Sequence, residues 1–197
     1  MELGKDNGEA RVKVLVFDRM EECTEAEVQR MLPLVSAQRR EQALKYQHTL
    51  GRFCCLKSWL MLKELAAESI PHSAFKYDAH GKPYWEDGPY FSISHSKEAI
   101  AVAIDEKPVG IDIEGIRRAD EDLMKRVMNE EERSAVSSAL LADRAYTRIW
   151  TQKEAVVKAE GVGIQSFEQL QMVLEKNKEW QVESFETETY IYSIAYK

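Results

Sequence analysis

Two carboxylates stand two residues apart in the stretch VGIDIEG, residues 109–115. Its β-branched residues predict a strand, in which alternate side chains project from the same face. Asp112 and Glu114 would then lie roughly 6–7 Å apart at Cα on one face, with Ile111 and Ile113 on the other. Adjacent negative charges repel unless salt, a basic side chain or a metal ion lies between them. Taken alone, the stretch fits an amphipathic strand with outward-facing acids equally well.

The stretch IWTQKEAVVKAEG, residues 149–161, carries a third acid. On a helix, Trp150, Glu154 and Lys158 fall at i, i+4 and i+8 and therefore share one face. Gly161 is a candidate for the glycine that ends this helix. By itself, Glu154 with Lys158 also fits an ordinary surface ion pair, which contributes only about 0.3–0.5 kcal/mol.

Two further groups lie upstream. FSISHS places Ser94 and His95 at the end of a predicted strand, before a hydrophilic turn, and the Gly-Lys-Pro turn contains Lys82 and Pro83. Each group is first of all a turn that uses local hydrogen bonds. Neither group indicates a binding site by itself, so each must be considered together with the other motifs.

Together the motifs favour a magnesium-assisted diphosphate site. Three carboxylates supply hard oxygen ligands, and Mg²⁺ leaves its other positions to water and substrate phosphate. Cationic partners for those phosphates are available in Lys82, His95 and Lys158.

The elements that must position these residues change in character along the chain. Alternation of apolar and polar residues predicts a strand at 11–17. Aromatic and β-branched residues between Gly and Pro turns predict strands at 74–77, 90–93, 99–104 and 109–114, and three more strands are predicted in the tail from 170 to 197. Helical spacing and Ser or Thr caps predict helices at 24–31, 36–46, 50–67, 121–127, 130–140 and 143–159. We therefore expect an α+β fold built from two α/β halves of similar plan, residues 1–107 and 108–197.

Composition narrows the function classes. The chain has 197 residues, 44% of them hydrophobic, and a formal net charge of −7, which argues against general nucleic-acid binding. No secretory leader or membrane span is evident, so we expect a cytoplasmic protein that does not bind a membrane. Three cysteines without paired spacing, Cys23, Cys54 and Cys55, are interpreted as buried hydrophobic residues rather than disulfides or zinc ligands.

The order and spacing of FSISHS, VGIDIE and WTQKEAVVKAEG resemble the 4′-phosphopantetheinyl transferases, specifically the long monomeric type that activates peptide synthetases. The resemblance runs from about Ser36 to Phe167. It implies two subdomains related by pseudo-twofold symmetry, each a small, mostly antiparallel sheet packed with helices. It also implies that coenzyme A binds in the cleft between them and that Mg²⁺, with Mn²⁺ as an alternative, bridges its diphosphate.

The resemblance also implies roles for particular residues. Asp112, Glu114 and Glu154 match metal-binding acids, and Glu154 is in addition the candidate base for an incoming serine, directly or through a water. Lys158 matches the lysine that holds the diphosphate. The remaining coenzyme-binding candidates are Ser94 and His95 near the 3′-phosphate, Lys82 and Pro83 beside the adenine, and Arg39 and Arg52 for the 3′-phosphate.

The implied partner is an apo acyl, peptidyl or aryl carrier protein that receives the 4′-phosphopantetheine arm on a serine. Because carrier proteins are acidic, a local basic patch is expected, with Arg117, Arg118, Lys125 and Arg126 as its candidates and Met124 and Met128 as apolar contacts. A monomer is the simplest expectation. Two alternatives stay open, another Mg-dependent phosphohydrolase and a silent coenzyme A-binding module, and the sequence does not select among fatty-acid, polyketide and nonribosomal-peptide carriers.

Overall fold

The computed structural model describes residues 2–3, 12–66, 75–77, 83–86, 88–161, 163 and 166–197. Its first sheet has four antiparallel strands in the order β1–β2–β6–β5, namely Glu2–Leu3, Val12–Phe17, Ile100–Asp105 and Tyr90–His95. One face of this sheet carries three helices, α1 (Glu25–Met31), α2 (Ala37–Leu44) and α3 (Thr49–Ala66). A separate two-stranded ribbon pairs β3 (Phe75–Tyr77) with β4 (Pro83–Trp85).

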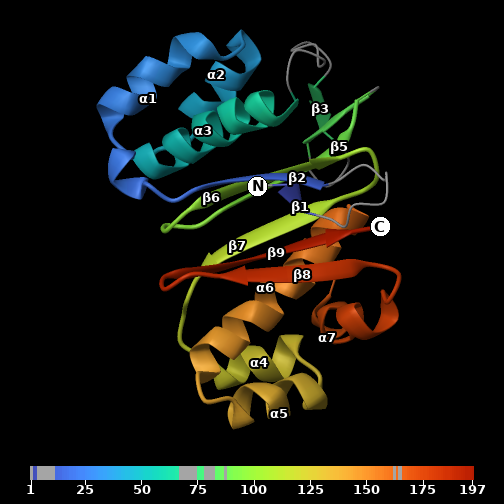
Figure 1. The fold of residues 1–197 in the computed structure, drawn as a ribbon. Helices are drawn as coiled ribbons and strands as arrows, with labels where there is room; N and C mark the ends of the chain where they lie inside the picture. The colour runs from blue at the N-terminus through green and yellow to red at the C-terminus, as the bar shows by residue number, and fades with distance from the viewer. Residues whose placement is uncertain are drawn as a thin grey trace.

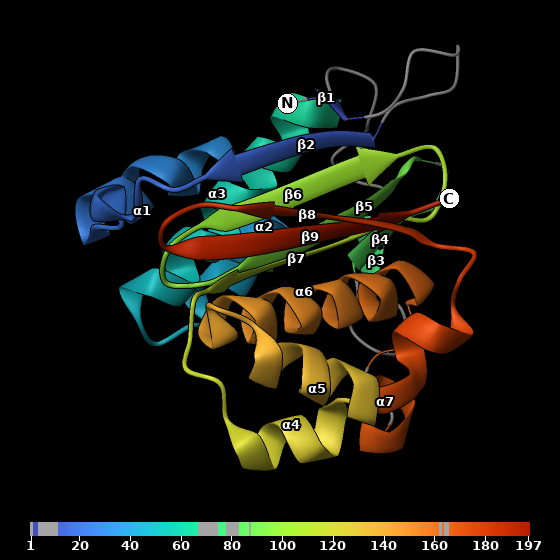
Figure 2. The ribbon, with the colours of Figure 1, turned by 60° about the horizontal axis from the view of Figure 1, so that its bottom comes forward.

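The second sheet has three antiparallel strands in the order β7–β9–β8: Gly110–Gly115, Tyr190–Tyr196 and Gln181–Glu186. The helix α6 (Ala142–Glu160) packs along β7 and β9 (Figure 2). Three shorter helices, α4 (Glu121–Val127), α5 (Glu130–Ser138) and α7 (Phe167–Lys176), lie on the far side of α6. The described residues therefore form an α+β structure with antiparallel sheets, which confirms the predicted fold class.

The two sheets lie between the two groups of helices (Figure 1). A buried cluster joins them, with Ala99, Ala101 and Ala103 on one side and Ile111 and Ile113 on the other. Small side chains on β6 allow the sheets to approach closely, and the isoleucines of β7 point into this interface. Asp112 and Glu114, which alternate with those isoleucines, therefore project from the opposite face of β7.

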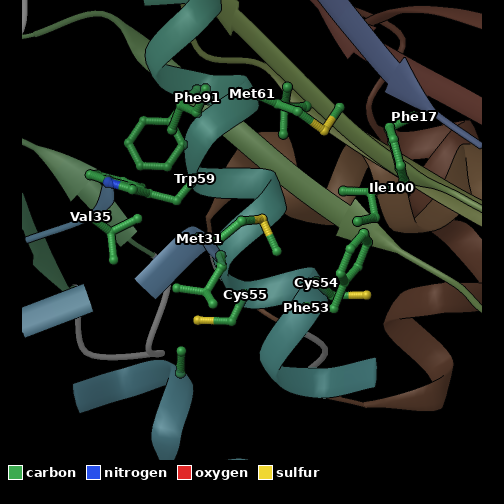
Figure 3. Close-up of a cluster of buried hydrophobic side chains, with 14 of the residues drawn as sticks. Phe17, Met31, Val35, Phe53, Cys54, Cys55, Trp59, Met61, Phe91 and Ile100 are labelled. Carbon is green, nitrogen blue, oxygen red and sulfur yellow. The ribbon is translucent and has the colours of Figure 1, made fainter. Parts of the chain in front are cut away.

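The helices of the first half pack on a core that includes two of the cysteines (Figure 3). Cys54 and Cys55 are buried on α3 among Phe53, Trp59 and neighbouring residues, and all three cysteines are free thiols. Burial raises the pKa of Cys54 to about 12, so its thiol stays protonated at neutral pH. The interpretation as buried hydrophobic residues is confirmed for these two, whereas Cys23 is only half-buried.

Local capping fixes the helix starts where the sequence predicts them. Thr24 accepts a hydrogen bond from the Glu27 backbone, and Ser36 accepts one from the Arg39 backbone. Asn129 and Glu132 form a complete capping box at the start of α5. These side chains satisfy amide groups that the helix itself leaves without partners.

The prediction of three strands in the tail is wrong. Residues 167–176 form α7, and only two strands, β8 and β9, follow it in the described tail. Ser166 caps this helix through the Gln169 amide, and Leu170 and Val173 are buried at helical spacing. The i, i+3 periodicity of the apolar residues therefore outweighs the strand tendency of the segment.

The predicted boundary between residues 107 and 108 falls in the connection from β6 to β7. The strands of the first sheet come from residues 2–105, and those of the second come from residues 110–196. The division of the chain into two halves at this position stays a prediction. No helix among the described residues is both long and apolar enough to cross a lipid bilayer.

Candidate active site

A pocket of about 350 Å³ opens where the two sheets meet α6. It is lined by Ile93, Ser94 and His95 at the end of β5, by Asp112 and Glu114 on β7, and by Trp150, Glu154 and Lys158 on α6. Segments more than sixty residues apart thus contribute to one site. The predicted shared face of Trp150, Glu154 and Lys158 is confirmed by their common lining of this pocket.

Glycines set the positions of both acidic elements. A Cβ placed on Gly110 would lie 1.9 Å from the Ala155 carbonyl oxygen and 2.5 Å from the Ala159 amide nitrogen. Only a residue without a side chain allows β7 to pass so close to α6, which explains the glycine at the start of GIDIE. Gly161 adopts a left-handed conformation with φ 74° and ends α6, as predicted.

Ser94, Asp112 and Lys158 form a closed triangle of polar contacts in the pocket wall. The Lys158 Nζ lies 2.7 Å from Asp112 Oδ1 and 2.9 Å from Ser94 Oγ. Ser94 Oγ in turn donates to Asp112 Oδ1 over 2.8 Å. The ammonium partly neutralises the aspartate, which supplies one of the countercharges that the paired acids of β7 require.

The hydrogen bonds of the carboxylates show which oxygen atoms could bind a cation. Asp112 is 4% exposed, and its Oδ2 atom is buried with no hydrogen-bond partner among the described residues. A buried carboxylate oxygen left without a donor is a natural ligand for a hard cation. Glu114 and Glu154 line the same pocket. However, no three acidic, histidine or cysteine side chains in the described residues are already drawn together as a ligand set.

The pocket changes the acidity of its glutamates. Burial, followed by the negative charge of Asp112, raises the pKa of Glu154 to about 7. Burial also raises the pKa of Glu114, and the guanidinium of Arg117 opposes that shift. A carboxyl group with a pKa near neutrality can accept a proton under physiological conditions, which suits a general base.

His95 lies at the open end of β5 and is exposed to solvent. Partial burial of its ring, followed by the positive charge of Lys158, lowers the pKa of His95. The imidazole is therefore neutral at neutral pH, and it can donate one N–H to a bound anion.

Because the pKa of Glu154 is raised, we expect that replacing this residue by an uncharged one stabilises the fold, and that the gain depends on pH. The folded protein disfavours ionised Glu154, so the wild type loses stability as the pH rises from about 4 through 7. Glu154→Gln does not titrate and should gain up to about 3 kcal/mol in unfolding free energy relative to wild type between pH 4 and pH 8. Urea unfolding in the presence of a chelator measures this, and parallel pH profiles would contradict it.

Trp150 packs at the side of the pocket against a basic residue. The Arg117 guanidinium lies 4.9 Å from the Trp150 ring and 5.7 Å from the Tyr146 ring, and its Nη2 lies 3.8 Å from Glu114. Arg117 thereby turns toward the site rather than toward an exposed patch. Trp150 supports this arrangement, consistent with a packing role.

The predicted 3′-phosphate arginines are engaged elsewhere. Arg39 donates to the Cys55 carbonyl over 2.6 and 3.1 Å and lies over Trp59. Arg52 donates to the Tyr46 carbonyl and pairs with Glu25. Neither arginine is among the residues that line the pocket.

The other candidates for coenzyme and carrier contacts have mixed outcomes. Lys82 lies outside the described residues, and Pro83 begins β4 without lining the pocket. Met124 and Met128 are buried in the core under α4, so their prediction as surface contacts is wrong. Met124 falls on the inward face of α4, and Met128 follows the end of that helix; both side chains belong to the same buried cluster.

Lys153 has a structural role in the packing of the helices. Its side chain is fully buried, and Nζ lies 2.8 Å from Glu132 on α5 and donates to the Leu170 and Gln171 carbonyls of α7. The lysine thus ties α6 to two other helices. A signal was present in the sequence, because Lys153 falls at helical spacing within the apolar stripe of Ile149, Val156 and Val157.

Comparisons with known proteins agree with the motifs. Residues 108–196 match the family model of the 4′-phosphopantetheinyl transferase superfamily. A 4′-phosphopantetheinyl transferase of Bacillus subtilis is 30% identical over 70% of this chain and 65% of its own length. The 4′-phosphopantetheinyl transferase gsp of Aneurinibacillus migulanus is 30% identical over 75% of this chain and 58% of its own length. The 4′-phosphopantetheinyl transferase AcpT of Salmonella typhimurium is 36% identical over 53% of this chain and 58% of its own length. The chain thus spans about three fifths of the relatives it matches, and its resemblance to this family is confirmed.

Proposed function

We propose, from the confirmed resemblance to the 4′-phosphopantetheinyl transferases, that this chain transfers the 4′-phosphopantetheine arm of coenzyme A to a serine of an apo carrier protein. The observation that carries the proposal is the pocket in which His95, Asp112, Glu114, Glu154 and Lys158 meet. Carboxylates for a cation and basic groups for phosphates are both required by diphosphate chemistry. The family match covers the segment that supplies four of these five residues.

In the proposed reaction, the carrier serine oxygen forms a bond to the β-phosphorus of coenzyme A. The bond from that phosphorus to the bridging oxygen breaks, and 3′,5′-ADP leaves with the electron pair. Glu154 accepts the serine proton, directly or through a water. Lys158 binds the diphosphate and stabilises the charge on the leaving group.

Asp112, Glu114 and Glu154 are the residues that would hold Mg²⁺ or Mn²⁺. Such a cation, when bound, neutralises charge on the phosphates of coenzyme A. The buried Oδ2 atom of Asp112, which accepts no hydrogen bond from the described residues, supports this assignment. His95, neutral and at the rim, is assigned to the 3′-phosphate as a hydrogen-bond donor.

The finer features of the family fit the same proposal. Coenzyme A would bind in the cleft between two halves related by pseudo-twofold symmetry, because the pocket takes residues from both sides of position 107. The carrier would bind near Arg118, Lys125 and Arg126, whose exposed positive side chains suit an acidic partner. The active species would be a monomer.

Incubation with coenzyme A, Mg²⁺ and a panel of apo carriers tests the proposal. The mass of a carrier should rise by the weight of one phosphopantetheine group, and that gain should require an intact carrier serine. Release of inorganic phosphate without a carrier would favour a phosphohydrolase. Binding of coenzyme A with no mass gain on any carrier would favour a silent binding module.

His95→Ala is expected to weaken the binding of coenzyme A by roughly tenfold, since one hydrogen bond to a charged phosphate is lost. The same variant should hardly change the affinity for 3′-dephospho-coenzyme A. Calorimetric titration with both ligands measures the difference. Equal losses for the two ligands would show that His95 does not contact the 3′-phosphate.

A further inference from the structure

The strands β5 and β7 are edge strands of different sheets, and serine hydroxyls join them. Ser92 Oγ accepts the Ile111 amide at 3.0 Å, and Ser94 Oγ accepts the Ile113 amide at 3.2 Å. Both serines are buried, on the same face of β5 and two residues apart. Their side chains satisfy amides that an edge strand would otherwise leave without partners.

The hydroxyl of Ser94 has no capacity left for a ligand. A serine hydroxyl offers one donor and two acceptor positions. Ser94 donates to Asp112 Oδ1, and it accepts from Lys158 Nζ and from the Ile113 amide. A phosphate oxygen could bind this group only by displacing one of these protein contacts.

The same contacts make the two oxygens of Asp112 unequal. Oδ1 is held by Ser94 and Lys158, whereas Oδ2 is buried without a hydrogen-bond partner among the described residues. The orientation of the carboxylate is thereby fixed, with one oxygen committed to protein donors. Outer contacts of this kind orient metal ligands and tune their affinity.

We infer that Ser94 is a positioning residue, which holds Asp112 and Lys158 so that Asp112 Oδ2 binds the divalent cation, rather than a ligand of the 3′-phosphate. This inference rests on the proposed function, because it concerns the cation that accompanies coenzyme A. It replaces the role that the family resemblance implies for Ser94. His95, next along the strand, keeps its assignment to the phosphate.

Manganese binding in the presence of saturating coenzyme A tests the inference, with paramagnetic resonance or calorimetry as the readout. Ser94→Ala should weaken Mn²⁺ binding by about 10–100-fold. Ser94→Thr keeps the hydroxyl and should restore the affinity to within a few fold. Ser92→Ala is the matched control, because it also removes the acceptor of one β7 amide, and its Mn²⁺ affinity should stay within about threefold of wild type.

Each outcome decides a separate point. Wild-type Mn²⁺ affinity in Ser94→Ala, or an equal loss in Ser92→Ala, would overturn the positioning role. A loss confined to 3′-phosphorylated coenzyme A, with Mn²⁺ affinity retained, would return Ser94 to the phosphate. Failure of the wild type itself to bind Mn²⁺ with coenzyme A would count against the proposed function instead. If Ser94→Ala does not fold, Ser94→Cys, which keeps a weak donor of similar size, should show the same direction of change.

Discussion

Replacement of Glu154 by glutamine is expected to lower the rate of carrier modification by roughly 10³-fold, the range assigned to a general base. The amide cannot accept the serine proton, and it is a poorer ligand for a hard cation than a carboxylate. The rate is measured as the appearance of the modified carrier by mass spectrometry. The fold should persist, because glutamine has nearly the same shape and removes a charge that burial disfavours.

Glu160→Gln is the matched control for this experiment. Glu160 is the last residue of α6, burial also raises its pKa, and it does not line the pocket. Its replacement should leave the rate within about twofold of wild type. If Glu154→Gln modified carriers as fast as Glu160→Gln does, Glu154 could be neither base nor essential ligand.

Lys153→Met is expected to destabilise the fold by about 3–5 kcal/mol, which is the cost of removing one partner from a buried ion pair. The substitution leaves Glu132 without its cation and removes the donor to the Leu170 and Gln171 carbonyls. Because Lys153 connects α6 to α5 and α7, its loss should weaken the packing of α6 against both helices. Urea unfolding monitored by circular dichroism gives the free energy of unfolding.

Lys125→Met provides the comparison at the surface. Lys125 is exposed on α4 and pairs with Asp122 at 3.6 Å, so its loss should cost less than about 1 kcal/mol. Similar unfolding midpoints for the two variants would mean that the buried pair contributes little net stability. Burial, rather than the presence of an ion pair, accounts for the expected difference.

Much of the fold follows from local patterns in the sequence. The predicted α4 matches residue for residue, and α1, α5 and α6 begin within one residue of their predicted starts. Capping side chains and apolar periodicity act within a few residues, so they can be recognised in one chain. The prediction for the tail is wrong because a short apolar run fits both the helical period of about 3.6 residues and the strand period of two. Burial against the neighbouring helices selects the helix.

The sequence by itself determined that Asp112 and Glu114 share one face of a strand and that Trp150, Glu154 and Lys158 share one face of a helix, since these relations depend only on residue spacing. Only the tertiary structure decided which of these groups meet. It joined Ser94 to Asp112 and Lys158, turned Arg117 toward Trp150, and directed Arg39 and Arg52 to backbone carbonyls outside the pocket. Long side chains reach whichever acceptor the packing of distant elements brings near, and spacing along the chain carries no information about that choice.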